Sequence, residues 1–233
     1  MRRIRVWDLP TRLFHWLLAA VVVGSFVSVK IGGNAMVWHG RFGYAALALL
    51  IFRLAWGFAG PVHARFASFI RGPGTVLASI RGERPHLLGH SPLAAWSVMA
   101  MLFFFFTQAI TGLFTSDDIL FDGPMAKRVS NATVELMGSL HRLNEWVLIS
   151  LVALHVLAIV FYRLVKKRKL TQAMITGDAV VDTARVITPN AGAELLGSTE
   201  PENLQASRDD GVMRARALVI FALAVGLVAY LSR

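Results

Sequence analysis

Five long runs of apolar residues, separated by polar and basic segments, dominate the chain. An α-helix needs about 20 apolar residues to cross the hydrocarbon core of a bilayer, and each run reaches or approaches this length. Tryptophans recur near the ends of the runs, where indole rings favour the membrane interface. The first run lacks the small-residue cleavage site of a signal peptide, so we expect a retained helix. The pattern therefore predicts five transmembrane helices, at about 13–30, 38–59, 93–114, 138–162 and 216–231.

The composition also indicates an integral membrane protein. Hydrophobic residues make up 55% of the 233 residues and charged residues 16%, whereas a soluble domain has about 25% charged residues. The chain has no cysteine, which excludes disulfides, cysteine-held iron–sulfur clusters, thiolate zinc sites and covalently attached c-type haem. The net charge of +10 lies mostly between the apolar runs. We therefore expect contact with membrane lipid and no nucleic-acid partner.

Basic residues in the loops predict how the helices are oriented. Seventeen Lys and Arg residues lie in segments 1–12, 61–92 and 163–216, and six lie on the opposite side. Because cytoplasmic loops carry the excess of these residues, we expect a cytoplasmic amino terminus and an external carboxy terminus. Residues 170–213 are polar and rich in small residues, which predicts a partly disordered cytoplasmic connector with a short surface helix. The predicted domains are a transmembrane four-helix bundle at 1–169, this connector, and a carboxy-terminal transmembrane helix at 214–233.

Four of the seven histidines fall within the apolar runs. His141 and His155 share one run, and fourteen helical residues separate them by about 21 Å while returning them to nearly the same face. With the predicted orientation, His39 lies with His141 near the outer face of the membrane, and His15 lies with His155 near the cytoplasmic face. We name these the outer pair (His39 and His141) and the inner pair (His15 and His155). The remaining histidines fall in a cytoplasmic loop and are expected to be solvated: His63, His86 and His90.

Two pairs of histidines at matched depth predict ligands for two metal-containing cofactors. Ionisable side chains inside a membrane usually face the bundle interior and serve a function. A single histidine is as often a structural residue bonded to a neighbouring carbonyl, but two such pairs on three helices favour ligation. Neutral imidazole binds haem iron, and bundle cores hold such cofactors. Zinc is disfavoured, because each level offers two histidines and no cysteine.

Two further residues on the helix of His39 bear on a haem site. Arg53 follows His39 by fourteen residues, so it repeats the same facing at the depth of the inner pair. Its guanidinium is expected either to pair with a haem propionate or to extend toward the cytoplasmic headgroups. Gly43, one turn after His39, is expected either to leave room for a flat macrocycle or to make a close helix contact.

Three motifs carry a resemblance to a known family: RVWDLPTRLFHW, WHGRFGYAALALLIFRLAWGFAGPVHARFASFIRGP, and the helix with two histidines that precedes LTQAMITGD. They resemble the prokaryotic cytochrome b561 family, which includes the cytochrome b subunits of nickel–iron hydrogenases. The resemblance covers about residues 1–178. It implies an all-α, integral membrane four-helix core in the bacterial inner membrane, with the fifth helix added outside the family pattern. It also implies two non-covalent haem b groups, with ligands at His15, His39, His141 and His155.

The function implied by the resemblance is transmembrane electron transfer between the quinone pool and a periplasmic redox partner. Quinone is then an exchangeable substrate near the cytoplasmic haem, and the chain is either a quinone oxidoreductase or the membrane subunit of one. The loop 115–135 is either solvated or an acidic face that steers a basic c-type cytochrome, since it carries Asp117 and Asp118. Two other functions fit the residues alone, namely a proton-relaying transporter and a structural membrane anchor without haem.

Overall fold

The computed structural model describes residues 2–70, 72–81, 92–116, 122–181 and 206–233. Five helices within these ranges are long and apolar enough to cross a membrane: α1 (Leu9–Ile31), α2 (Met36–Ala59), α5 (Pro92–Gly112), α6 (Asn131–Leu164) and α9 (Gly211–Leu231). They confirm the five predicted spans and the all-α membrane fold. α6 begins earlier than the apolar run, because Ser130 caps it by accepting from the backbone N–H of Thr133.

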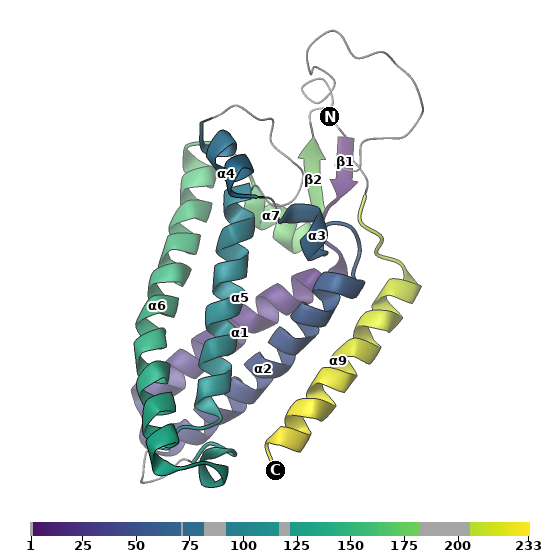
Figure 1. Ribbon diagram of the computed structural model, residues 1–233. Coiled ribbons are helices and arrows are strands. Elements are labelled where there is room, and N and C mark those ends of the chain that lie inside the picture. The colour runs from purple at the N-terminus through teal and green to yellow at the C-terminus, as the bar shows by residue number, and fades with distance from the viewer. Residues whose placement is uncertain (1, 71, 82–91, 117–121, 182–205) are drawn as a thin grey trace.

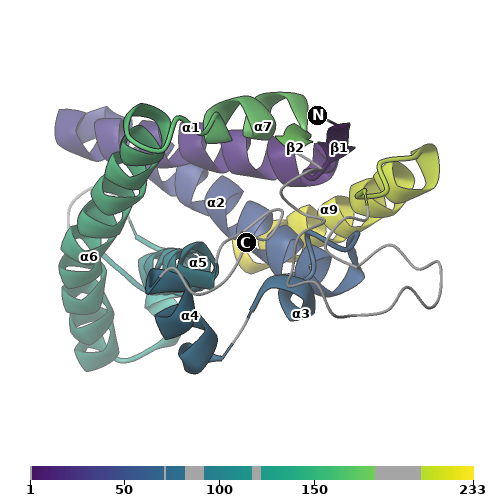
Figure 2. The same ribbon diagram turned by 90° about the horizontal axis from the view of Figure 1, so that it is seen from above.

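α1, α2, α5 and α6 form a four-helix group, and α9 lies against α2 on the side away from α6 (Figure 1, Figure 2). α1 packs along α2, and α5 packs along α6. The small side chains of α9 that face α2 allow the two backbones to approach closely. The largest core cluster therefore joins three helices, with buried residues that include Phe14, Leu18, Leu50, Trp56, Ala217 and Ala224. Many large apolar side chains remain exposed, as contact with lipid requires, among them Phe103, Leu157 and Leu223.

Shorter elements gather at one end of the helix group, around the start of α1 and the end of α6 (Figure 1). α3 (Phe66–Phe69) and α4 (Pro73–Ile80) follow α2, and α7 (Leu170–Thr176) follows α6. Two 3-10 turns lie in other connections: η1 (Gly33–Ala35) joins α1 to α2, and η2 (Ala126–Arg128) lies between α5 and α6. α7 is the kind of short helix that the composition of 170–213 predicts. Residues 182–205 of that predicted connector lie outside the described part of the chain.

A small β-sheet at this end was not expected from the sequence. β1 (Arg2–Arg5) pairs in antiparallel fashion with β2 (Asp178–Val181), so that Arg5 lies opposite Asp178. The pairing buries the side chain of Ile4. A strand of four residues is too short for its alternating pattern to stand out, and its partner lies 173 residues further along the chain. The sheet therefore joins the amino terminus to the segment that follows α7.

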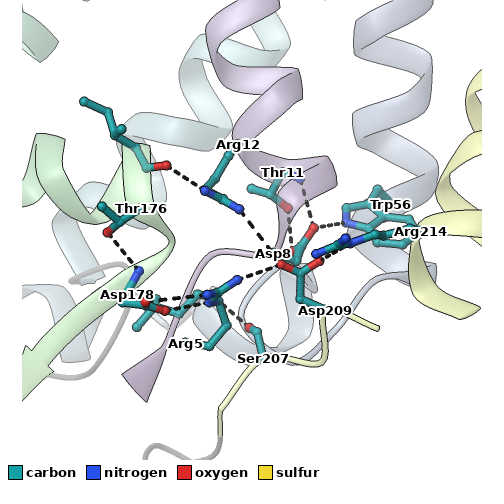
Figure 3. Close-up of polar contacts among 12 residues, drawn as sticks. Arg5, Asp8, Thr11, Arg12, Trp56, Thr176, Asp178, Ser207, Asp209 and Arg214 are labelled. Atoms are coloured by element: carbon teal, nitrogen blue, oxygen red, sulfur yellow. Dashed lines mark hydrogen bonds and ion pairs between the residues drawn. The ribbon is translucent and has the colours of Figure 1, made fainter. Parts of the chain in front are cut away.

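Arg5 and Asp209 tie β1, β2 and the start of α9 together (Figure 3). Arg5 donates from Nε to Asp178 at 2.6 Å and from Nη1 to Asp209 at 2.8 Å. Arg214 donates to the other carboxylate oxygen of Asp209 at 3.1 Å. Burial alone would raise the pKa of Asp209, but the hydrogen bonds from Arg214 and Arg5 outweigh it and hold the pKa below its usual value. Charge-assisted bonds as well as apolar packing thus attach α9 to the rest of the protein.

Asp8 caps α1 and bonds it to the far end of α2. Its carboxylate accepts from the backbone N–H of Thr11 at 2.9 Å, from the Thr11 hydroxyl at 2.8 Å and from Trp56 Nε1 at 3.2 Å. Burial raises the pKa of Asp8, whereas the bonds from Thr11 and Trp56 favour the ionised form. These bonds hold α1 and α2 together at the end of the helix group nearest His15.

Candidate functional site

The structure brings His39 of α2 and His141 of α6 together. The centroids of their imidazole rings lie 6.2 Å apart, with the ring planes at 86°. His39 Nδ1 lies 3.0 Å from the backbone carbonyl of Ser25 and 3.1 Å from the Ser25 hydroxyl, both on α1. Because a carbonyl oxygen only accepts, Nδ1 of His39 carries the proton. Nε2 of His39 therefore keeps the lone pair that a metal ion needs.

His15 of α1 and His155 of α6 form the second pair. Their ring centroids lie 6.5 Å apart at an interplanar angle of 53°. Trp16 lies edge-on to His15, with the two ring centroids 4.9 Å apart. His15 Nδ1 is buried and has no hydrogen-bond partner. The pairing of histidines in space is thus the pairing by depth that the sequence predicts, and the two pairs differ in how their Nδ1 atoms are bonded.

Both separations fit two imidazoles that hold one metal ion between them. With metal–nitrogen bonds of about 2.0–2.1 Å, and ring nitrogens about 1.2 Å from the ring centre, two imidazoles that share a metal ion have centroids up to about 6.5 Å apart. The measured 6.2 Å and 6.5 Å agree with this value. A Cβ added to Gly43, one turn from His39, would meet nothing within 4 Å. Gly43 therefore makes no close helix contact, and the α2 surface beside His39 has room for a flat group.

Arg53 is buried, with 3% of its surface exposed. Its guanidinium lies over the ring of Phe66 in α3, with the Arg53 Cζ atom 4.8 Å from the ring centroid. Arg53 Nη1 is buried without a hydrogen-bond partner. The side chain therefore does not extend to the headgroups, which was one of its two expected roles. An unpaired buried guanidinium is costly, so this position suits an anionic group that the protein binds.

His63 differs from its prediction as a solvated residue, because only 8% of its surface is exposed. Residues 61–65 fold into a tight turn, in which the backbone N–H of Ala64 donates to the carbonyl of Pro61 at 2.9 Å. Ala64 is fully buried in the main apolar core, which draws His63 into the protein as well. His86 and His90 lie outside the described residues.

The family described as prokaryotic cytochrome b561 matches residues 6–177, which covers α1 to α7 and all four paired histidines. The chain belongs to the prokaryotic cytochrome b561 family. It is 25% identical over 210 residues to a probable Ni/Fe-hydrogenase B-type cytochrome subunit of Cupriavidus necator, covering 74% of this chain and 85% of that protein. No solved structure matches the chain.

Membership of the cytochrome b561 family makes the protein a multi-pass membrane cytochrome of the b type that takes part in electron transfer. The family implies b-type haem, and the two histidine pairs are the residues in the described part of the chain whose geometry suits it. Residues beyond 177, including α9, lie outside the matched region.

Two hydroxyl-bearing residues that contact the paired histidines were not predicted from the sequence. Ser25 contacts His39, and the hydroxyl of Thr111 in α5 lies 3.1 Å from His141 Nδ1. Both are polar residues inside long apolar runs, and this was the signal that could have revealed them. Hydroxyl-bearing residues are common in membrane helices, where they bond to the backbone of their own helix. Which of them reaches a histidine depends on how the helices pack.

Proposed function

We propose that this cytochrome b561 holds two haem b groups without covalent attachment and conducts electrons across the membrane. The inner pair, His15 and His155, would supply the ligands of one haem. The outer pair, His39 and His141, would supply those of the other. Each haem would carry one electron at a time, and the two histidines on α6, fourteen residues apart, are separated by about 21 Å along that helix.

The observation that carries this proposal is the separation of the ring centroids in each pair. Values of 6.2 Å and 6.5 Å match two imidazoles on opposite sides of one metal ion. The hydrogen bonds of His39 and His141 through Nδ1 leave Nε2 of each ring available as a ligand. A proton relay would instead favour rings bonded to one another or to water along a path through the membrane.

The electrons would pass between the quinone pool near the cytoplasmic haem and a redox partner in the periplasm. The relative from Cupriavidus necator is named as a subunit of a Ni/Fe hydrogenase, so a larger redox subunit is one candidate partner, and a c-type cytochrome is another. Asp117 and Asp118, the residues of an acidic docking face, lie outside the described part of the chain. Asp122 in the same loop forms an ion pair with Lys127 at 3.4 Å, which offsets part of the negative charge of that face.

Arg53 would bind a propionate of the inner haem. Its guanidinium is buried and its Nη1 atom lacks a partner, so a carboxylate would satisfy both its charge and its donor. The stacking of Arg53 on Phe66 would hold the planar guanidinium in one orientation for that contact.

The first test is the number of haems. Purified protein, expressed with sufficient haem, is expected to bind two haems per chain, because two pairs have the required geometry. A pyridine haemochrome assay combined with a protein determination measures this ratio. A colourless folded protein would favour the transporter or anchor functions, and one haem per chain would disprove the two-site arrangement.

The second test concerns orientation in the bacterial inner membrane. The chain has no cysteine, so single cysteines can be labelled without background. Lys127→Cys and Lys167→Cys are matched positions, because both side chains are exposed and they lie at opposite ends of α6. With a cytoplasmic amino terminus, a membrane-impermeant maleimide is expected to label Lys127→Cys in intact spheroplasts and to label Lys167→Cys only after lysis. The reverse pattern would invert the proposed direction of the two haem sites.

A further inference from the structure

α5 carries neither histidine pair, yet it contacts the residue that completes the outer pair. The hydroxyl oxygen of Thr111 lies 3.1 Å from His141 Nδ1, and Thr111 is 5% exposed. The single hydroxyl proton of Thr111 is used within α5, since Oγ1 donates toward the carbonyls of Thr107 at 2.7 Å and Gln108 at 3.1 Å. The Thr111 oxygen is therefore free to accept, and His141 Nδ1 is its donor.

A second contact between α5 and α6 controls the rotation of α6 at this level. Asn144, three residues after His141, is 5% exposed, and its Nδ2 atom donates to the Phe104 carbonyl at 2.9 Å and to Gln108 Oε1 at 2.7 Å. Residues three apart lie on the same side of a helix, so these bonds turn His141 toward α5 and the interior. Hydrogen bonds from a buried side-chain amide are costly to break where water cannot replace them.

Gly112 provides the space for the imidazole of His141. A Cβ at this position would lie 3.0 Å from His141 Cε1, which is closer than an ordinary van der Waals contact. The ring therefore lies directly against the backbone of α5, beside Thr111. The hydrogen bond, the side-chain contacts of Asn144 and this close approach together restrict the orientation of the His141 imidazole.

We propose that Thr111 is a positioning residue, which fixes the Nδ1–H tautomer of His141 and makes its Nε2 a stronger donor to the outer metal site. This inference rests on the proposed function. A hydrogen bond accepted from Nδ1–H raises the basicity of a ligating imidazole, and a more basic ligand favours ferric over ferrous iron. His39 has a comparable bond to the Ser25 carbonyl, whereas His15 Nδ1 has none. The outer site should therefore have the lower reduction potential of the two.

The test is a redox titration of three purified variants, followed through the α bands of the haems. Thr111→Val removes the accepting oxygen at nearly constant volume, and Thr111→Ser keeps it. Thr107→Val is the matched control, because the Thr107 hydroxyl bonds to the Phe103 carbonyl at 3.0 Å, one turn from Thr111 on the same helix. Comparison with the spectrum of His39→Ala identifies the outer haem.

In Thr111→Val, the reduction equilibrium of the outer haem is expected to move about tenfold toward the ferrous form, which is 59 mV for one electron. The inner haem should keep its potential, Thr111→Ser should restore the outer one, and Thr107→Val should change neither. If both haems kept their reduction potentials in Thr111→Val, or if Thr107→Val shifted the outer potential as much as Thr111→Val, the positioning role of Thr111 would be overturned. The proposed function would stand in either case. If the unsubstituted protein bound no haem, the proposed function would be overturned, and this inference with it.

Discussion

Replacing His141 with Ala is expected to remove one haem from the purified protein and to leave the other. Among the described residues, His141 and His39 are the only two histidines at the outer level, with ring centroids 6.2 Å apart, so no neighbouring imidazole takes over. The inner pair lies about 21 Å away along α6 and keeps both of its ligands. A pyridine haemochrome assay should fall from two haems per chain to one, and a redox titration should lose one of two midpoints.

The four single variants of the paired histidines form an internal control for this result. His39→Ala should reproduce the spectrum of His141→Ala, while His15→Ala and His155→Ala should share a different one. His63→Ala is a matched control, because His63 is buried but belongs to neither pair, and it should retain both haems. If His39→Ala and His155→Ala removed the same midpoint, the pairing of ligands across the bundle would be disproved.

Replacing Arg53 with Met is expected to weaken haem binding at the inner site. The substitution keeps most of the volume of the side chain but removes the buried charge and the unpaired Nη1 donor that would bind a propionate. Substitution of a residue that supports a metal-containing site typically lowers the affinity for the bound group by about 10- to 100-fold. The measurement is haem retention during transfer to apo-myoglobin, with the inner haem identified from the His15→Ala spectrum.

Arg65→Met is the control for Arg53, because Arg65 is an exposed arginine in the turn that follows α2. It should leave the rate of haem transfer unchanged. If Arg53 instead had no anionic partner, Met would relieve a buried unpaired charge and raise the thermal stability of the protein. The propionate contact would therefore be contradicted if Arg53→Met transferred neither haem faster and unfolded at a higher temperature.

The positions of the four paired histidines could be predicted because two regular quantities define them. The helix rise sets the depth of His155 relative to His141, and the excess of basic residues in the loops sets which way each helix runs. Together they match His15 with His155 and His39 with His141 before any contact is known. Burial of His63 could not be predicted in this way, because it depends on a tight turn beneath the core residue Ala64.

The sequence by itself determined the number of spans, the all-α class and the position of each paired histidine along its helix, since all three follow from hydrophobicity and helix periodicity along a single segment. Only the tertiary structure decided the contacts between segments. Thr111 reaches His141 across thirty residues of chain, and Arg5 reaches Asp209 across 204. Such contacts depend on the rotation and tilt of neighbouring helices. Small differences in packing energy between many side chains set these angles, and no local pattern in the chain records them.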